Sequence, residues 1–198
     1  MKNIIFLAML AFSLLPGCSY TINHTPVQIS YIANIQGPRV TLVVPRDSQE
    51  YVYTHHRGTD TWSLMVGAAL VDISRQLFSS HFASLTFTGQ IPGQGVMNES
   101  DKIVVLSLTK FEPDIGWTVF SSHDGTVTLE VTVQNGKGVE LVHKTIVGKS
   151  SAAGRDKLVT WGVLLFTPAG VMGYNEAMEE MITKCLVDAI GQAVEIVP

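Results

Sequence analysis

The feature that most constrains the fold is a pair of short apolar runs separated by an Asn-Gly dipeptide. Apolar and polar residues alternate from Thr126 to Val133, which is the pattern of a strand with one buried face. Asn135-Gly136 follows, and a second run begins at Val139. Asn-Gly between two such runs is a strong hairpin signal. The chain is therefore expected to contain an antiparallel hairpin, and the buried face of that hairpin needs a covering layer.

Two amphipathic segments can supply this layer. In the first, apolar residues recur at helical spacing from Trp62 to Phe78, and Thr59 or Asp60 is the expected N-cap. The second begins near Asn175, and acidic residues gather in its first turns, where the helix dipole favours them. The apolar stripe of this second helix is expected to consist of Ala177, Met181, Cys185, Leu186, Ala189 and Ala193.

Further runs of strand type lie around these elements. They cover Val27–Ile35, Val40–Val44, Ser84–Thr88 and Ile103–Leu108. The order is then strands, helix, several strands with a hairpin, and helix. This order predicts an α+β fold, in which a mixed, mostly antiparallel sheet carries two main helices packed on one face.

The N-terminus has the form of a secretion signal. Lys2 precedes an apolar stretch that ends at Leu15 and is too short to span a bilayer. Leu15-Pro16-Gly17-Cys18 follows, and it resembles the lipobox of bacterial lipoproteins, although Pro16 departs from the usual small or β-branched residue. The resemblance implies a signal peptide over residues 1–17, a diacylglyceryl group on Cys18 and a third acyl chain, such as palmitate, on its new amino group. An ordinary secretion signal with an incidental cysteine is the alternative.

The same resemblance implies a location. Three acyl chains hold a protein firmly at a membrane, because stable anchoring takes more than one chain. Ser19, rather than Asp, follows the cysteine. By resemblance to enterobacterial sorting this implies the outer membrane, with the protein facing the periplasm. We expect residues 18–26 to be a lipidated N-terminus and polar tether, and residues 27–198 to form one periplasmic domain. The layout resembles small envelope lipoproteins of the LptE, YajG and PelC types, and the N-terminal domain of TolB.

Charge and cysteine content argue against nucleic-acid binding and against an internal disulfide. Of 13 basic residues, Lys2 belongs to the signal, so 12 remain against 17 acidic residues. This balance predicts no binding to nucleic acid, which needs a basic surface. If Cys18 carries lipid, Cys185 is the one remaining cysteine and no internal disulfide forms. Its apolar surroundings indicate a buried structural thiol, and an intermolecular disulfide is the alternative.

No motif in the sequence predicts catalysis, a metal or a cofactor. His55-His56 would point to opposite faces of a strand, and no spacing typical of a zinc site completes a ligand set. The glycine-rich stretch from Gly89 to Gly95 lacks the Gly-Lys-Ser/Thr of a phosphate-binding loop. No Gly-x-Ser-x-Gly occurs either. We therefore expect no enzyme, no metal and no cofactor.

One uncharged apolar segment, from Leu158 to Tyr174, stands out from the polar connections. Pro168 and its glycines oppose a single regular helix. It either folds back on the core or contacts the membrane, a second copy or an envelope protein. The polar residues from Ser150 to Lys157 just before it are expected to be mobile. The candidate contact residues are Trp161, Leu164, Leu165, Phe166 and Met172.

These observations favour a non-catalytic accessory or assembly factor that acts through protein contacts at the outer membrane. Its partner would be an envelope protein or a second copy of the chain. The alternative is a transport accessory or carrier that binds lipid or another apolar ligand between sheet and helices. An envelope enzyme with an unrecognised site is the least favoured hypothesis.

Overall fold

The computed structural model describes residues 19–26, 28, 38–57, 60–93, 98, 101–115, 123–152 and 168–198. The expected strand Val27–Ile35 lies outside the described residues, apart from Gln28. In chain order the elements are β1 (Ser19–Ile22), β2 (Arg39–Val43), α2 (Arg46–Gln49), β3 (Tyr53–Arg57), β4 (Asp60–Leu64), α3 (Val66–His81), β5 (Ser84–Thr88), β6 (Lys102–Ile115), β7 (His123–Asn135), β8 (Glu140–Ala152) and α4 (Pro168–Glu195).

The strands form two sheets, and together with the helices they confirm the predicted α+β class. The larger sheet has five strands in the order β5-β2-β6-β7-β8. In it β2 runs parallel to both β5 and β6, whereas β6, β7 and β8 are antiparallel. The smaller sheet has the order β1-β4-β3, with β1 parallel to β4. This second sheet was not expected from the sequence.

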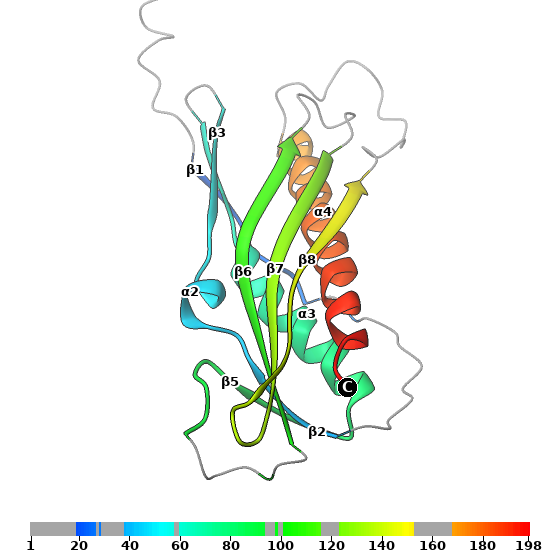
Figure 1. The fold of residues 1–198 in the computed structure, drawn as a ribbon. Coiled ribbons are helices and arrows are strands. Elements are labelled where there is room, and N and C mark those ends of the chain that lie inside the picture. Colours follow the sequence, from blue (N-terminus) through cyan, green and yellow to red (C-terminus); the bar gives the residue numbers. More distant parts are fainter. Residues whose placement is uncertain are drawn as a thin grey trace, which may run out of the picture.

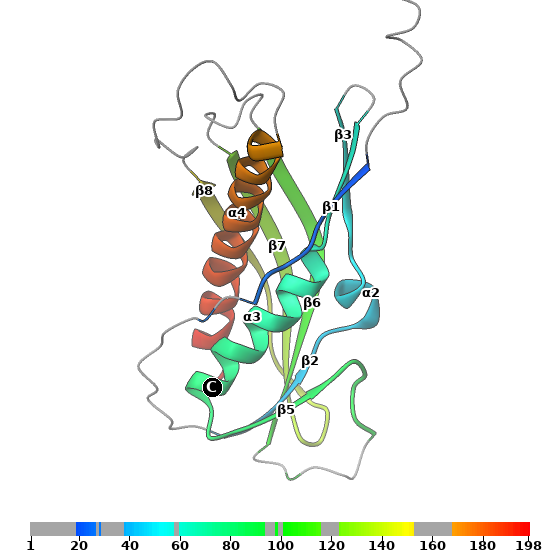
Figure 2. The ribbon, with the colours of Figure 1, turned by 180° about the vertical axis from the view of Figure 1, so that it is seen from behind.

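The two long helices lie on the same face of the larger sheet, as predicted (Figure 1). Seen from behind, α3 and α4 stand in front of that sheet, and the smaller sheet lies beside them (Figure 2). The two sheets are joined by side chains: Tyr53 of β3 meets Phe111 of β6 edge to face, with ring centroids 5.4 Å apart. The core therefore sits between the larger sheet and a layer made of two helices and a small sheet.

The central hairpin confirms the alternation seen in the sequence. Val127, Leu129 and Val131 of β7 are fully buried, while the residues between them are half-exposed. The turn differs in detail from a two-residue Asn-Gly turn. Asn135 Oδ1 accepts hydrogen bonds from the backbone N–H groups of two following residues, and the positive φ of 80° falls on Gly138. The glycine that the turn requires is therefore Gly138, because a side chain is disfavoured at that φ.

The first long helix begins later than predicted. Residues Asp60–Leu64, which were expected to start it, form β4, and α3 begins at Val66. Trp62 and Leu64 are buried while the residues between and before them are half-exposed. Over so few residues, an alternating pattern and a helical pattern of apolar residues cannot be told apart. Pairing with β1 and β3 makes this segment a strand.

The last helix begins earlier than predicted, at Pro168 instead of near Asn175. Proline is well accommodated in the first turn of a helix, where its missing N–H has no partner to lose. The predicted apolar stripe is buried, and Gly148 of β8 brings the sheet close to it. A Cβ atom at Gly148 would lie 2.2 Å from the backbone oxygen of Cys185. Only glycine permits this approach of helix to strand.

The structure also bears on the expected mobile stretch after β8 and on membrane-spanning helices. Residues Ser150–Ala152, expected to be part of a mobile stretch, are instead the last residues of β8. They pair with β7, so their backbone is held by the sheet. Among the described helices, none is both long and apolar enough to cross a membrane.

Candidate functional site: the junction after the predicted lipid anchor

The residues that follow Cys18 are part of the folded domain. Ser19 is the first residue of β1 and lies opposite Thr61 of β4, and the pairing continues to Ile22 opposite Leu64. Residues 18–26 were expected to be a polar tether, and this expectation is wrong for residues 19–26. The short polar segment has no periodicity of its own, and tertiary contacts give it its structure.

Aromatic packing strengthens the attachment of β1. Tyr20 stacks on Trp62 of β4, with ring centroids 4.5 Å apart and an angle of 24° between the planes. Stacked aromatic pairs of this kind stabilise by about 0.5–1.5 kcal/mol beyond the area they bury. Ile22, at the end of β1, is buried in the core, and its backbone oxygen accepts a hydrogen bond of 3.2 Å from Met65. The strand is therefore held along its whole length.

Beyond β1 the chain crosses from the smaller sheet to the helices. His24 Nε2 lies 2.9 Å from Oδ2 of Asp72 on α3. The His24 side chain is only 6% exposed, and that of Asp72 is 30% exposed. Asp72 Oδ2 also accepts a 2.9 Å hydrogen bond from Gln76 Nε2, which fixes the carboxylate. Hydrogen bonds to charged groups contribute about 1.5–3 kcal/mol each.

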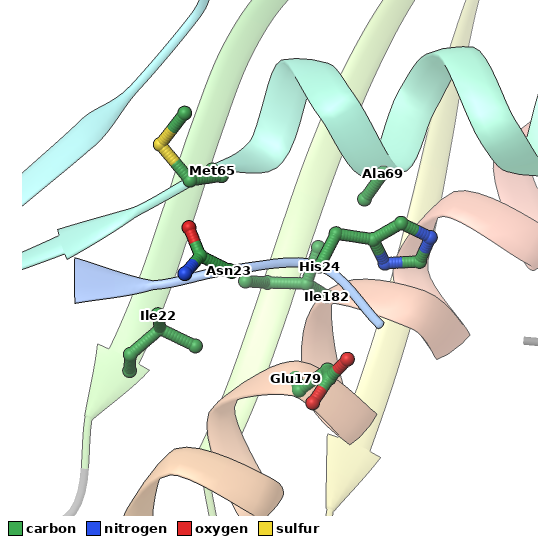
Figure 3. Close-up of a pocket in the computed structure, with 7 residues that line it drawn as sticks. All are labelled: Ile22, Asn23, His24, Met65, Ala69, Glu179 and Ile182. Carbon is green, nitrogen blue, oxygen red and sulfur yellow. The ribbon is translucent and has the colours of Figure 1, made fainter. Parts of the chain in front are cut away.

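The next residue contacts the other helix. The backbone N–H of Thr25 donates a hydrogen bond to Glu179 Oε1 on α4. Figure 3 shows the segment passing between the two helices, with Glu179 rising from α4 on one side and Ala69 of α3 on the other. The segment therefore bridges α3 and α4, and we call residues 19–26 with their partners on β4, α3 and α4 the anchor junction.

A small cavity lies within the anchor junction. Its volume is about 10 Å³, which is room for one water molecule and far too little for an acyl chain. It is lined by Ile22, Asn23, His24, Met65, Ala69, Glu179 and Ile182 (Figure 3).

A larger hollow of about 450 Å³ lies along β2 and β5, the two strands at the end of the larger sheet opposite to β8. Serine and threonine residues contribute hydroxyl groups to its lining, and one cation and one anion, Arg39 and Asp101, accompany them. Asp101 already accepts a 3.0 Å hydrogen bond from the backbone N–H of Asn98, so its carboxylate shapes the adjoining turn. Hydroxyl and charged groups therefore share the lining of this hollow with apolar atoms. Its remaining lining residues are Val40, Thr41, Ser84, Thr86, Thr88, Gln90 and Pro92.

Cys185 is buried on α4 against the sheet, as the sequence indicated. A Cβ atom at Gly125 of β7 would lie 2.8 Å from its Sγ atom, which shows how closely the strand approaches the thiol. Burial raises the pKa of Cys185 to about 11, and a hydrogen bond with Ser150 opposes this only in part. The thiol therefore stays protonated at neutral pH and is a poor nucleophile. An intermolecular disulfide would first require the helix to move.

The histidines are dispersed. His55 and His56 lie next to each other on β3, where His55 is half-buried and His56 is exposed, with Nδ1 3.2 Å from Thr61 Oγ1. His123 is buried on β7, and His143 of β8 lies 3.0 Å from Glu130 Oε1. In the described part of the chain, no three histidine, cysteine or acidic residues gather as metal ligands would. That the protein holds no metal stays a prediction.

The sequence-predicted contact residues are placed only in part. Trp161, Leu164, Leu165 and Phe166 lie outside the described residues, as does Cys18. Met172 belongs to α4.

The structure adds a surface that sequence reasoning missed, at the outer edge of β8. Among the described strands, β8 lies at the end of the larger sheet and pairs only with β7. Near its end the backbone N–H of Lys149 donates to Asp188 Oδ2 at 2.9 Å, and Val147 O accepts a hydrogen bond from Gln192 Nε2 at 3.4 Å. Two side chains of α4 thus cover this part of the edge, as natural sheets often protect their edges.

The rest of the β8 edge has a different character. Backbone groups of alternate residues point the same way, so those of His143 and Thr145 face outward as those of Lys149 do. For these two residues the described structure records no covering contact from α4. Val139 before the strand is 58% exposed, and Leu141 is 42% exposed. We call residues 139–145 the open edge. The only sequence signal for it was the apolar character of the second hairpin arm, which by itself also fits a buried strand.

Comparisons with known proteins give a fold but no family. No protein-family model matches the sequence, and no curated protein matches it. Among solved structures, protein XCC0632 from Xanthomonas campestris, of the family DUF330, matches with a TM-score of 0.51 and 11% identity over 89% of this chain and 94% of that chain.

Two further similar structures are of bacterial lipoproteins. A minor lipoprotein from Acinetobacter baumannii has a TM-score of 0.42 and 8% identity, over 81% of this chain and 93% of that chain. Rare lipoprotein B from Shewanella oneidensis has a TM-score of 0.38 and 11% identity, over 79% and 93%. Because both TM-scores are below 0.5, we draw nothing more from them. The chain shares its fold with the Xanthomonas protein, and at this identity the likeness extends to the fold alone.

Proposed function

We propose that this chain is an outer-membrane-anchored periplasmic lipoprotein that acts as a non-catalytic accessory or assembly factor through protein contacts. The anchor follows from the lipobox-like Leu15-Pro16-Gly17-Cys18, and Ser19 after the cysteine favours the outer membrane. The domain then works as a surface held in place at the membrane.

The observation that carries this proposal is the anchor junction. β1 begins at Ser19, one residue after the cysteine, and His24 ties the following segment to Asp72 of α3. Such an attachment suits a protein that must present one surface at a fixed place. We therefore assign the lipid a positioning role.

Two surfaces are candidates for the contact itself. One is the open edge, where an extended segment of a partner protein would add a strand next to β8 and cover the exposed Leu141. The other is the apolar segment that contains Trp161 and Phe166, whose described neighbours Ala152 and Pro168 end β8 and begin α4.

The alternative is a carrier that binds an apolar ligand between sheet and helices. This needs space between the two layers, whereas the facing side chains of β7 and α4 there, such as Leu129 and Met181, are fully buried. The small cavity of the anchor junction has room for a single water molecule. Native mass spectrometry of the purified protein decides this point, because a co-purified lipid would favour the carrier.

The anchor is tested by metabolic labelling with palmitate. The unaltered chain should incorporate label and fractionate with outer membranes, and Cys18→Ala should lose the label and be released from membranes. Cys185→Ala is the matched control, since it removes the other cysteine and should leave labelling unchanged. Continued labelling of the Cys18→Ala chain contradicts the anchor.

The contact role is tested with variants of the two surfaces in the full lipidated chain. Thr145→Pro removes an outward N–H, which an edge strand tolerates, and blocks strand addition, whereas Thr145→Val keeps the N–H as a control. Trp161→Ser combined with Phe166→Ser alters the apolar segment. Cross-linked partner complexes isolated from envelopes should be lost with one of these changes and kept with Thr145→Val. Unchanged complexes with both altered surfaces contradict the proposal.

A further inference from the structure

The predicted lipid attachment joins the domain at one end of the molecule. Ser19 lies opposite Thr61, and the next pair along, Arg57 with Asp60, is the last of the β3–β4 hairpin. The tip of the smaller sheet therefore lies next to the point where the chain leaves for Cys18.

The larger sheet and α4 reach the same end. Ile115 lies opposite His123, and His123 lies opposite Ala152, so the end of β6, the start of β7 and the end of β8 coincide. Helix α4 begins there with Pro168, and both views show these ends beside the β3–β4 hairpin (Figures 1 and 2). We call this the anchor end. The turn between β7 and β8 and the C-terminus lie at the opposite end.

The anchor junction leaves almost no freedom between the lipid and the domain. A flexible tether of eight residues would have a root-mean-square span of about 16 Å and would let the domain tumble. Instead, β1 is paired from Ser19 to Ile22, and His24 and Thr25 bind α3 and α4. A single peptide bond then separates the lipid-bearing residue from the sheet.

From this geometry we propose that the anchor end rests against lipid headgroups and that the β7–β8 turn points away from the membrane. This inference rests on the proposed lipid anchor. β7 has 13 residues. At about 3.4 Å per residue, this places the turn about 40 Å from the headgroups when the strands stand upright. The open edge of β8, which runs next to that turn, is then presented away from the membrane.

The charges at the anchor end indicate which interaction holds this end at the membrane. Asp60 lies opposite Arg57 at the hairpin tip, and Asp114 and Asp124 lie opposite each other near the ends of β6 and β7, so acidic residues outnumber basic ones at these paired positions. Acidic groups are not attracted to anionic lipids, whose surface potential favours lysine and arginine. The acyl chains therefore supply the binding, and the orientation comes from the covalent junction. High salt should therefore change the orientation of the domain little.

The experiment measures how close each end lies to the headgroups. The full lipidated chain is reconstituted in vesicles of phosphatidylethanolamine and phosphatidylglycerol at a ratio of about 3:1, with a nitroxide on some headgroups. A fluorescent label is placed at Asp60→Cys or Asp114→Cys at the anchor end, or at Val139→Cys at the far end. Cys18 carries lipid and Cys185 is buried, so native labelling spares both.

We expect strong quenching at both anchor-end positions and almost none at Val139→Cys, at low and at high salt. A chain with an eight-residue Ser-Gly linker between Cys18 and Ser19 is the matched control, and its quenching at the anchor end should fall several-fold while it still floats with the vesicles. Equal quenching at all positions in a chain that floats overturns the orientation and leaves the anchor intact. A chain that neither floats nor incorporates palmitate overturns both.

Discussion

His24 Nε2 lies 2.9 Å from Asp72 Oδ2, although 48 residues separate the two in the chain. This contact joins the N-terminal segment to α3 in a place where the histidine ring is almost completely buried. Removing Asp72 leaves the buried histidine without its partner, so the contact contributes more to the attachment than an exposed ion pair would.

The first prediction follows from this contact. Asp72→Ala should lower the free energy of unfolding by about 1–3 kcal/mol, because it removes the carboxylate that accepts the hydrogen bond of the buried His24 ring. The measurement is denaturant unfolding of the Cys18→Ala chain with and without the change. Hydrogen exchange of the β1 amides should also speed up, while that of β6 should not.

Glu180→Ala is the matched control for that experiment. Glu180 Oε1 pairs with Lys184 Nζ at 2.7 Å on α4, and both side chains are about half exposed. Its removal should change the free energy of unfolding by less than about 0.5 kcal/mol. An equal loss in both variants would show that the His24–Asp72 contact has no special weight.

A second prediction concerns the close approach of α4 to β8. Gly148→Ala should destabilise the fold by about 1–3 kcal/mol or more, because the new Cβ atom would lie 2.2 Å from Cys185 O and 2.7 Å from Ala189 Cβ. Gly191→Ala, on the helix α4 that Gly148 contacts, is the control, because a Cβ atom at Gly191 meets nothing within 4 Å. It should stabilise by about 0.5–1 kcal/mol through helix propensity. Thermal unfolding measures both, and a neutral Gly148→Ala would contradict the packing.

The third prediction is a pH dependence that belongs to Cys185. Its pKa is raised from 9.0 to about 11 by burial, so the folded state keeps the thiol proton where the unfolded state loses it. The contribution to stability is therefore complete below pH 9 and is lost as the pH rises through about 11. Unfolding free energies at pH 8, 9.5 and 11 measure this loss, and Cys185→Ala should show a flatter profile in this range.

Reactivity of the same thiol gives a separate test. In the folded Cys18→Ala chain, iodoacetamide at pH 8 should modify Cys185 many times more slowly than in the chain unfolded by denaturant, because the thiol is buried and protonated. Mass spectrometry of timed samples measures the two rates. Equal rates would mean that the α4–sheet contact opens freely.

The fourth prediction concerns the covered part of the β8 edge. Asp188→Ala removes the acceptor of the Lys149 backbone N–H and the 3.3 Å partner of Gln192 Nε2, so more of the edge becomes available for pairing. The variant should self-associate at lower concentration than the unaltered domain, as exposed edges do. Analytical ultracentrifugation of both proteins in the Cys18→Ala background measures this. A monomer at every concentration would show that the cover is dispensable.

Much of the fold was predictable because its signals are local. The alternation in β7 and the stripe around Cys185 and Ala189 each follow from the spacing of apolar residues along one element. The boundaries failed where two patterns coincide. Asp60–Leu64 fits a helix or a strand over five residues, and the pairing partners β1 and β3 lie outside that window. Pro168 was taken as a helix breaker, although the first turn of a helix accepts it.

By itself, the sequence determined the α+β class, the hairpin, the two-helix layer, the buried thiol of Cys185 and the lipobox-like motif at Cys18. Only the tertiary structure decided that the residues from Ser19 onward join the fold, because β1 has no helical or alternating signal and owes its shape to β4, His24 and Asp72. Short polar segments carry too little local preference to specify a structure, so their conformation depends on partners that are distant in the chain. In this protein that dependence turns an expected tether into a fixed junction.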